Sequence, residues 1–127
     1  MLPTTDKARI GLLGEEAAID LLRRQGLRIV ARNWRSGSYE LDIVALQRGV
    51  LYFIEVKTRR AASLTSPEEA LTPHKIRSLQ HAARAFLAAN GARYDGYDVQ
   101  FDLVTVRHND LGELQLERIE QAIELGW

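Results

Sequence analysis

The sequence predicts a single α/β domain whose elements follow the order αβββαββ. Apolar residues recur at helical spacing in two stretches, and the remaining segments show the alternation or the β-branched content that is typical of strands. With 127 residues the chain has the usual length of one domain, and its 46% hydrophobic content is enough for one core. We therefore expect one domain that spans residues 1–127.

The first helix is predicted over residues 6–25. Thr5 is a suitable N-cap residue, and Gly26 is a typical C-terminal stop. Five apolar residues recur at helical spacing, so we expect them to form the buried stripe: Ile10, Leu13, Ala17, Leu21 and Leu22.

Three strands are predicted after this helix. Residues 27–33 are rich in β-branched and apolar side chains and form the first strand, and a loop over residues 34–37 follows it. Residues 38–46 and 50–58 form a hairpin about a short polar turn. If the turn consists of Arg48 and Gly49 alone, the numbers of paired residues add up to 97.

The second half of the chain predicts a loop, a helix and two further strands. Thr72 and Pro73 are a strong helix start, as N-cap and first helical residue, and Gly91 ends this second helix. The other segments expected here are a loop over 59–72 with one helical turn at 67–71, a strand at 98–106, a turn at 108–113, a fifth strand at 114–119 and an optional terminal helix at 120–125.

The composition excludes several kinds of function. The chain has no cysteine, so disulfides, thiolate metal sites and a cysteine nucleophile are excluded. Because 17 basic residues balance 17 acidic ones, any affinity for a polyanion has to come from a local basic patch or a bound metal. The longest apolar run, residues 50–54, is too short to span a membrane, and the N-terminus lacks the pattern of a signal peptide. We expect a soluble, cytoplasmic protein.

Four charged residues alternate along the two strands of the predicted hairpin: Glu40 and Asp42 on the first, Glu55 and Lys57 on the second. Side chains two residues apart share one face of a strand. The predicted register sets Asp42 opposite Glu55 and Glu40 opposite Lys57, and opposed Cβ atoms lie about 4.5 to 5.5 Å apart. Two carboxylates at that spacing could bind one divalent cation.

These residue types are those that metal-dependent phosphodiester cleavage requires. Asp42 and Glu55 would bind Mg²⁺ or Mn²⁺, with the backbone carbonyl of Val56 as a further candidate ligand. Lys57 would orient or deprotonate the attacking water, or stabilise the developing negative charge. Glu40 is either an outer ligand or the cross-strand partner that holds Lys57, and we favour the partner role. The alternative for all four is a solvated face of an antiparallel hairpin.

Glu15 is a candidate auxiliary ligand on the first helix. It lies at the flank of the apolar stripe, whereas Glu16 points to the solvated side. If the helix packs on the sheet, Glu15 could complete a site that Asp42 and Glu55 begin. An exposed helix charge is the alternative interpretation.

Basic residues near these segments are candidates for nucleic-acid contacts. Arg59 and Arg60 adjoin Lys57 and suit contacts to the phosphate backbone. Arg35 follows Trp34, and the two could stack on an unpaired base, although Trp34 is more often a core or lid residue. The second helix presents a stripe of basic side chains opposite its apolar one, for which a solvated face is the competing interpretation: His74, Arg77, His81 and Arg84.

Several segments in this order resemble the YraN-like family of small bacterial proteins. The likeness covers most of the chain: residues 11–17, 33–35, 39–44, 53–59, 72–75 and 101–104. This family is placed within the PD-(D/E)XK nuclease superfamily, close to archaeal Holliday-junction resolvases. The resemblance implies a restriction-endonuclease-like αβββαβ core with a mixed central sheet flanked by helices. It also implies a site in which Glu15, Asp42, Glu55 and Lys57 match the superfamily's acids and Glu-x-Lys.

The resemblance implies a magnesium-dependent endonuclease that acts on DNA, in branched or processed form, with RNA as the alternative substrate. Lys75 lies in one of the matching segments and joins His74 and Arg77 as a candidate nucleic-acid contact. Since resolvases act as dimers on two-fold symmetric junctions, a homodimer is expected by analogy. Two alternatives remain: a catalytically silent nucleic-acid-binding module with the same fold, and a partner-binding domain in which Glu40 and Lys57 are only an ion pair.

Overall fold

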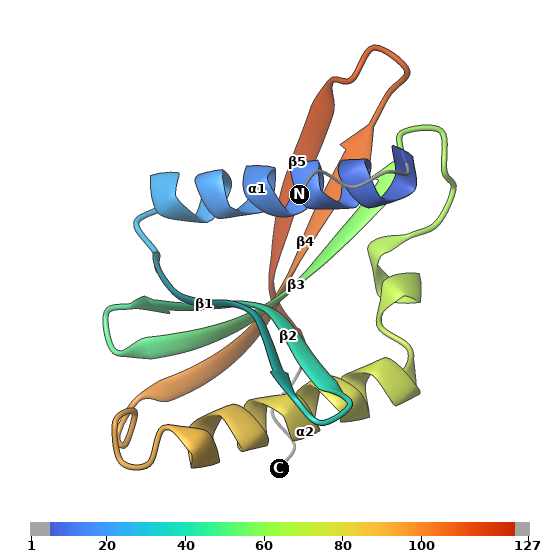
Figure 1. Cartoon of the computed structure of the whole chain (residues 1–127). Coiled ribbons are helices and arrows are strands. Elements are labelled where there is room, and N and C mark those ends of the chain that lie inside the picture. The colour runs from blue at the N-terminus through green and yellow to red at the C-terminus, as the bar shows by residue number, and fades with distance from the viewer. Residues whose placement is uncertain (1–5, 124–127) are drawn as a thin grey trace.

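A computed structural model describes residues 6–123, in which a five-stranded mixed sheet lies between two long helices (Figure 1). The strand order is β1-β2-β3-β4-β5, with β3 and β4 parallel and the other neighbours antiparallel. This confirms the predicted αβββαβ core with a mixed sheet. The elements are α1 (Asp6–Arg24), β1 (Arg28–Ser36), β2 (Tyr39–Gln47), β3 (Val50–Arg60), the 3-10 helix η1 (Pro67–Ala70), α2 (Pro73–Ala89), β4 (Asp98–His108) and β5 (Leu114–Ile123).

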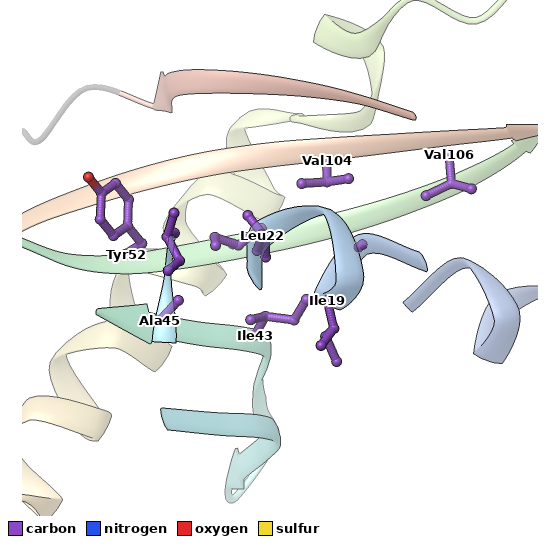
Figure 2. Packing of buried hydrophobic residues seen from close by; sticks show 10 residues of the cluster. Ile19, Leu22, Ile43, Ala45, Tyr52, Val104 and Val106 are labelled. Atoms are coloured by element: carbon purple, nitrogen blue, oxygen red, sulfur yellow. The ribbon is translucent and has the colours of Figure 1, made fainter. Parts of the chain in front are cut away.

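Helix α1 covers one face of the sheet. Ala18, Ile19 and Leu22 are fully buried there, and Figure 2 shows Ile19 and Leu22 among side chains of β2, β3 and β4. The predicted stripe is wrong in part, because Leu13 is 53% exposed. The face that contacts the sheet begins at Gly14, a residue that hydropathy cannot identify. The predicted N-cap, Thr5, lies outside the described residues.

Helix α2 covers the opposite face. It begins as predicted, because the Thr72 hydroxyl oxygen accepts a hydrogen bond from the Lys75 N–H at 3.2 Å and Pro73 occupies the first turn. It buries Leu79, Ala82, Ala83 and Phe86 against the sheet. Within residues 6–123, neither this helix nor any other is both long enough and apolar enough to cross a membrane.

The β2–β3 hairpin has the predicted turn. Arg48 and Gly49 have φ angles of 50° and 77°, as a two-residue type I′ turn requires. The register runs from the Gln47–Val50 pair to the Ile43–Ile54 pair, so paired numbers do add up to 97. The ladder ends at Ile43 and Ile54, and this end lies next to the charged residues.

Two predicted boundaries are wrong. The expected loop at residues 34–37 is largely strand, since β1 continues to Ser36 and turns only at residues 37–38. The tip of this hairpin is held against α2, where the Trp34 ring packs edge-on to Phe86 with centroids 5.3 Å apart. The optional helix at 120–125 is also wrong where the structure describes it, because β5 continues to Ile123; residues 124 and 125 lie outside the described range.

A buried ion pair fixes β5 to β4. The Arg118 Nε–H donates to Asp102 Oδ2 at 2.9 Å, and the other oxygen of Asp102 accepts from the Gln121 N–H at 3.0 Å. Asp102 is 3% exposed, and the Arg118 guanidinium also lies over the Tyr52 ring. This network is part of the scaffold, and Asp102 is paired in register with Ile54, the last residue of β3 in the β2–β3 ladder.

Candidate active site

The candidate site lies where β2 and β3 separate. If the ladder continued, Leu41 would face Val56, but Leu41 pairs with Trp34 of β1 and is buried. The Val56 N–H donates instead to Asp42 Oδ2 at 2.9 Å. From this point the β1–β2 hairpin bends toward α2 while β3 continues in another direction (Figure 1). The separation leaves the Asp42 carboxylate between the two strands.

The backbone of Val56 presents a further oxygen to the same place. In an extended strand, the N–H and C=O of one residue point to the same edge. Because the Val56 N–H points to Asp42, its carbonyl also lies on the side of β3 that faces the opening. The carbonyl direction, which could not be deduced from the sequence, therefore fits the predicted role of Val56 as a candidate ligand.

Glu55 lies at the opening with its side chain almost fully buried. Its side chain is 10% exposed, and its Oε1 lies 3.1 Å from Lys75 Nζ on the first turn of α2. Burial raises the pKa of the Glu55 carboxyl to about 7, and the negative charge of Asp42 adds to this; Lys75 and Lys57 act in the opposite direction. The positive charge around Glu55 is therefore too small to keep the pKa of its carboxyl at the usual value.

Burial also shifts the pKa values of three neighbouring titratable groups. Burial raises the pKa of Asp42, partly offset by the Val56 hydrogen bond and the charge of Lys75. Burial and the charge of Asp42 raise the pKa of Glu15. The pKa of Lys57 is lowered, by partial burial first and by the positive charge of Arg59 second. A lysine with a lowered pKa is better suited to accept a proton.

A close contact between α1 and β3 positions Glu15. A Cβ atom at Gly14 would lie 2.3 Å from the Thr58 hydroxyl oxygen, so only glycine allows the helix to approach this closely. The next residue along the helix is Glu15, and the Asn33 side chain donates a hydrogen bond to it. Asn33 adopts a left-handed conformation, with φ of 49°, at the position of β1 opposite Asp42.

An open cavity of about 1140 Å³ joins these groups. Its walls are formed by the first half of α1 and the second half of β3, and acidic groups lie at its base: Glu15, Asp42 and Glu55. Lys57, Arg59 and Arg60 line it as predicted. Three basic residues that sequence analysis did not consider also line it, namely Lys7, Arg9 and His108. A chain with no net charge thus has a basic rim around an acidic centre.

The pairing predicted between Glu40 and Lys57 is wrong. The β2–β3 ladder ends before these residues, and Glu40 forms an ion pair with Arg35 of β1 at 3.5 Å instead. The charge of Glu40 nevertheless raises the pKa of both Asp42 and Glu15, so Glu40 belongs to the acidic group. Its role as an outer ligand, the alternative considered above, now fits better than a role as the partner of Lys57.

The remaining predicted contacts are dispersed. Arg35 is exposed near the tip of the β1–β2 hairpin, and His74 and Arg77 lie on the exposed side of α2. Lys75 does not share that outward position, because it contacts Glu55. Besides the three basic residues of the cavity named above, Lys75 and Asn33 have positions at the site that the sequence did not reveal. Both lie in segments that resemble the YraN-like family, and that resemblance was the available signal.

The residues present fit a hard divalent cation. No three acidic or imidazole groups among residues 6–123 form a complete metal site by themselves. Mg²⁺ does not need one, because it is usually bound by one or two carboxylates, with water and substrate phosphate as the other ligands. Asp42, Glu55 and the Val56 carbonyl match that donor set. The role of Glu15 as an auxiliary ligand stays a prediction.

Comparisons with known proteins identify the family. The sequence model of uncharacterised protein family UPF0102 matches residues 14–106. A UPF0102 protein from Nitratidesulfovibrio vulgaris is 47% identical over 117 residues, which cover 91% of this chain and 84% of that protein. One from Mycolicibacterium vanbaalenii is 42% identical over 107 residues, with 84% and 87% covered.

A relative from Oleidesulfovibrio alaskensis is 52% identical over 98 residues. The matched part covers 76% of this chain but 46% of that protein, so the chain spans about half of this relative's length. The matched family region, residues 14–106, includes Glu15, Asp42, Glu55, Lys57 and Lys75. The chain belongs to the uncharacterised protein family UPF0102.

Proposed function

We propose that this protein is a metal-dependent phosphodiester hydrolase that cuts DNA, in branched or processed form. The observation that carries the proposal is the half-buried carboxylate of Asp42 and the buried one of Glu55, beside Lys57 in an open cavity. Buried acids with raised pKa values are costly to a fold unless a cation or a reaction uses them. The resemblance to PD-(D/E)XK nucleases, and to resolvases among them, points to the same chemistry.

Asp42 and Glu55 would bind Mg²⁺ or Mn²⁺ together with the Val56 carbonyl. A bound divalent ion would lower the pKa of a water molecule and neutralise charge on the scissile phosphate. Lys57 would orient this water or accept its proton, which its lowered pKa favours. Glu15 would hold further ligand water from the α1 side of the cavity.

The rim of the cavity supports a polyanionic substrate. Lys7, Arg59 and Arg60 line the same cavity as the acidic groups, so a phosphate backbone would find positive charge on the way to the metal. Because these basic groups lie at one opening, the cavity would attract a polyanion although the whole chain has no net charge. DNA is the proposed substrate, and RNA is the alternative that the same chemistry allows.

Substitution of Lys57 tests the proposal. Lys57→Ala should leave Mg²⁺ affinity nearly unchanged and lower the cleavage rate about a hundredfold or more, because it removes the group that handles the water proton. The assay incubates labelled single-stranded, duplex, flap and four-way DNA with Mg²⁺ or Mn²⁺ and separates the products on a gel. Arg24→Ala, at an exposed position in the last turn of α1, is the control for loss of one positive charge.

Two results would contradict the proposal. One is that the wild-type protein cleaves none of these substrates with either metal. The other is that Lys57→Ala cleaves as fast as the wild-type protein. Salt-dependent DNA binding that survives Asp42→Ala, without metal-stimulated cleavage, would identify a silent binding module instead.

A further inference from the structure

Lys75 is a sequence-predicted nucleic-acid contact that forms an ion pair with Glu55, a proposed metal ligand. Its Nζ lies 3.1 Å from Glu55 Oε1, and the side chains of Lys75 and Glu55 are 42% and 10% exposed. The Thr72 cap fixes the backbone of Lys75 in the first turn of α2. Its long stem therefore extends from the protein surface to the acidic centre, and the positive charge of its ammonium group stabilises Glu55.

A divalent cation on Glu55 would conflict with this ion pair. The metal and the ammonium group would share one carboxylate, and like charges within a few ångströms repel strongly in a partly buried site. Glu55 is held in the sheet, whereas Lys75 has a flexible four-carbon stem with access to solvent. The ammonium group is therefore the partner that moves.

The residues around Lys75 indicate which anion its ammonium group would contact after displacement from Glu55. Helix α2 contains no aspartate or glutamate, so its own helix offers no other carboxylate. Its exposed side presents basic side chains, with His74 and Arg77 next to Lys75 in sequence. An anion that approaches this end of α2 beside the cavity would be attracted to Lys75 as soon as Glu55 no longer holds it.

We infer that Lys75 exchanges between two anions: it pairs with Glu55 when the site holds no metal and with a substrate phosphate when a metal occupies Glu55. This inference rests on the proposed function. It makes Lys75 a positioning residue that couples the two binding events. By linkage, metal binding strengthens nucleic-acid binding and nucleic-acid binding strengthens metal binding.

The first test measures Mg²⁺ affinity by calorimetry at pH 9, well above the pKa of about 7 of Glu55. Lys75→Met should bind Mg²⁺ about fivefold more tightly than the wild-type protein, because the competing cation is removed. Lys75→Arg, which keeps the charge, should bind Mg²⁺ with nearly wild-type affinity. Arg77→Met removes a positive charge from the exposed side of the same helix and should leave the affinity unchanged.

The second test measures how DNA affinity depends on salt, with labelled duplex and with all proteins carrying Lys57→Met to prevent cleavage. In Mg²⁺, Lys75→Met should reduce the slope of log affinity against log salt by about one, because one phosphate contact is lost. Without metal the two slopes should agree, since Lys75 is then bound to Glu55.

Each outcome decides between the two claims. Equal or weaker Mg²⁺ binding by folded Lys75→Met, or a slope that falls by one with and without metal, would overturn the exchange while leaving the proposed function intact. If the wild-type protein binds no Mg²⁺, the proposed function fails and the exchange fails with it. Urea unfolding of each variant verifies that the fold is retained.

Discussion

Replacing Glu55 with glutamine should stabilise the metal-free protein, although it removes a proposed metal ligand. In the folded state the pKa of Glu55 is raised from 4.5 to about 7. The folded protein thus binds this proton more tightly than the unfolded chain, and the stability of the wild-type protein falls as pH rises from about 4.5 to 7. Glutamine mimics the protonated form and avoids that loss.

The size of the stability gain follows from how far the pKa of Glu55 is raised in the folded state. About 1.4 kcal/mol per pKa unit gives a gain of about 3 kcal/mol for Glu55→Gln at pH 8, and of about 1 kcal/mol at pH 5, where folded Glu55 is already protonated. Burial of the carboxylate is the main source of this gain at pH 8, and relief of repulsion from the Asp42 charge is the second.

Urea unfolding in EDTA at pH 8 and pH 5 measures the effect. The control is Glu117→Gln on the exposed side of β5, for which we expect less than about 0.5 kcal/mol at either pH. If Glu55→Gln is less stable than the wild type at pH 8, or differs from it equally at both pH values, the charge of Glu55 does not destabilise the fold. Such a result would mean that Glu55 is well compensated by Lys75 and has no need of a metal.

Three further predictions concern the scaffold and the pH dependence of the site. Gly14→Ala should destabilise the fold by about 1 to 3 kcal/mol, because its Cβ meets Thr58, and Thr58→Ala in the same chain should restore part of the loss in urea unfolding. Asp102→Ala should cost about 3 kcal/mol or more by removing the buried carboxylate that pairs with Arg118, yet leave Mg²⁺ affinity unchanged in calorimetry. Saturating Mg²⁺ should raise the melting temperature more at pH 8 than at pH 5, where protons compete for Glu55; an equal rise would contradict this.

Short sequence motifs correctly predicted the register of the β2–β3 hairpin and the start of α2. The two-residue turn at Arg48 and Gly49 determined the hairpin register, because such turns leave few options. Thr72 and Pro73 determined the start of α2 in the same way. The face of α1 was partly wrong because its closest contact with the sheet is made by Gly14, which has no side chain to count.

The misassigned end of β5 has a physical cause. Ile119 and Ile123 are four residues apart, which is a helical spacing. In the structure Ile119 pairs with Leu103 and Ile123 with Phe101, so the strand gains extra residues in an irregularity between them. Gln121 has φ of 53° there, and its N–H is directed at Asp102. An irregular strand of this kind imitates helical periodicity, and sequence pattern cannot separate the two.

The sequence predicted which residues of β2 and β3 come together at the site, although the β2–β3 ladder ends before them. Asp42, Glu55 and Lys57 line one cavity, as expected from neighbouring strands. The opposition of Glu40 and Lys57 failed because Asp42 takes the Val56 N–H and the ladder ends. The contact between Lys75 and Glu55 joins residues 20 positions apart in the sequence through the packing of α2 on the sheet, which no local pattern specifies.

A calorimetric titration of Mg²⁺ into the wild-type protein and into Asp42→Asn at pH 8 tests the proposed metal site most directly. We expect the wild-type protein to bind one Mg²⁺ per chain, and Asp42→Asn to bind it with an affinity at least about tenfold lower, because a neutral amide replaces a charged ligand of the ion. The absence of binding by the wild-type protein, or equal affinity of both proteins, would contradict a metal site at Asp42 and Glu55.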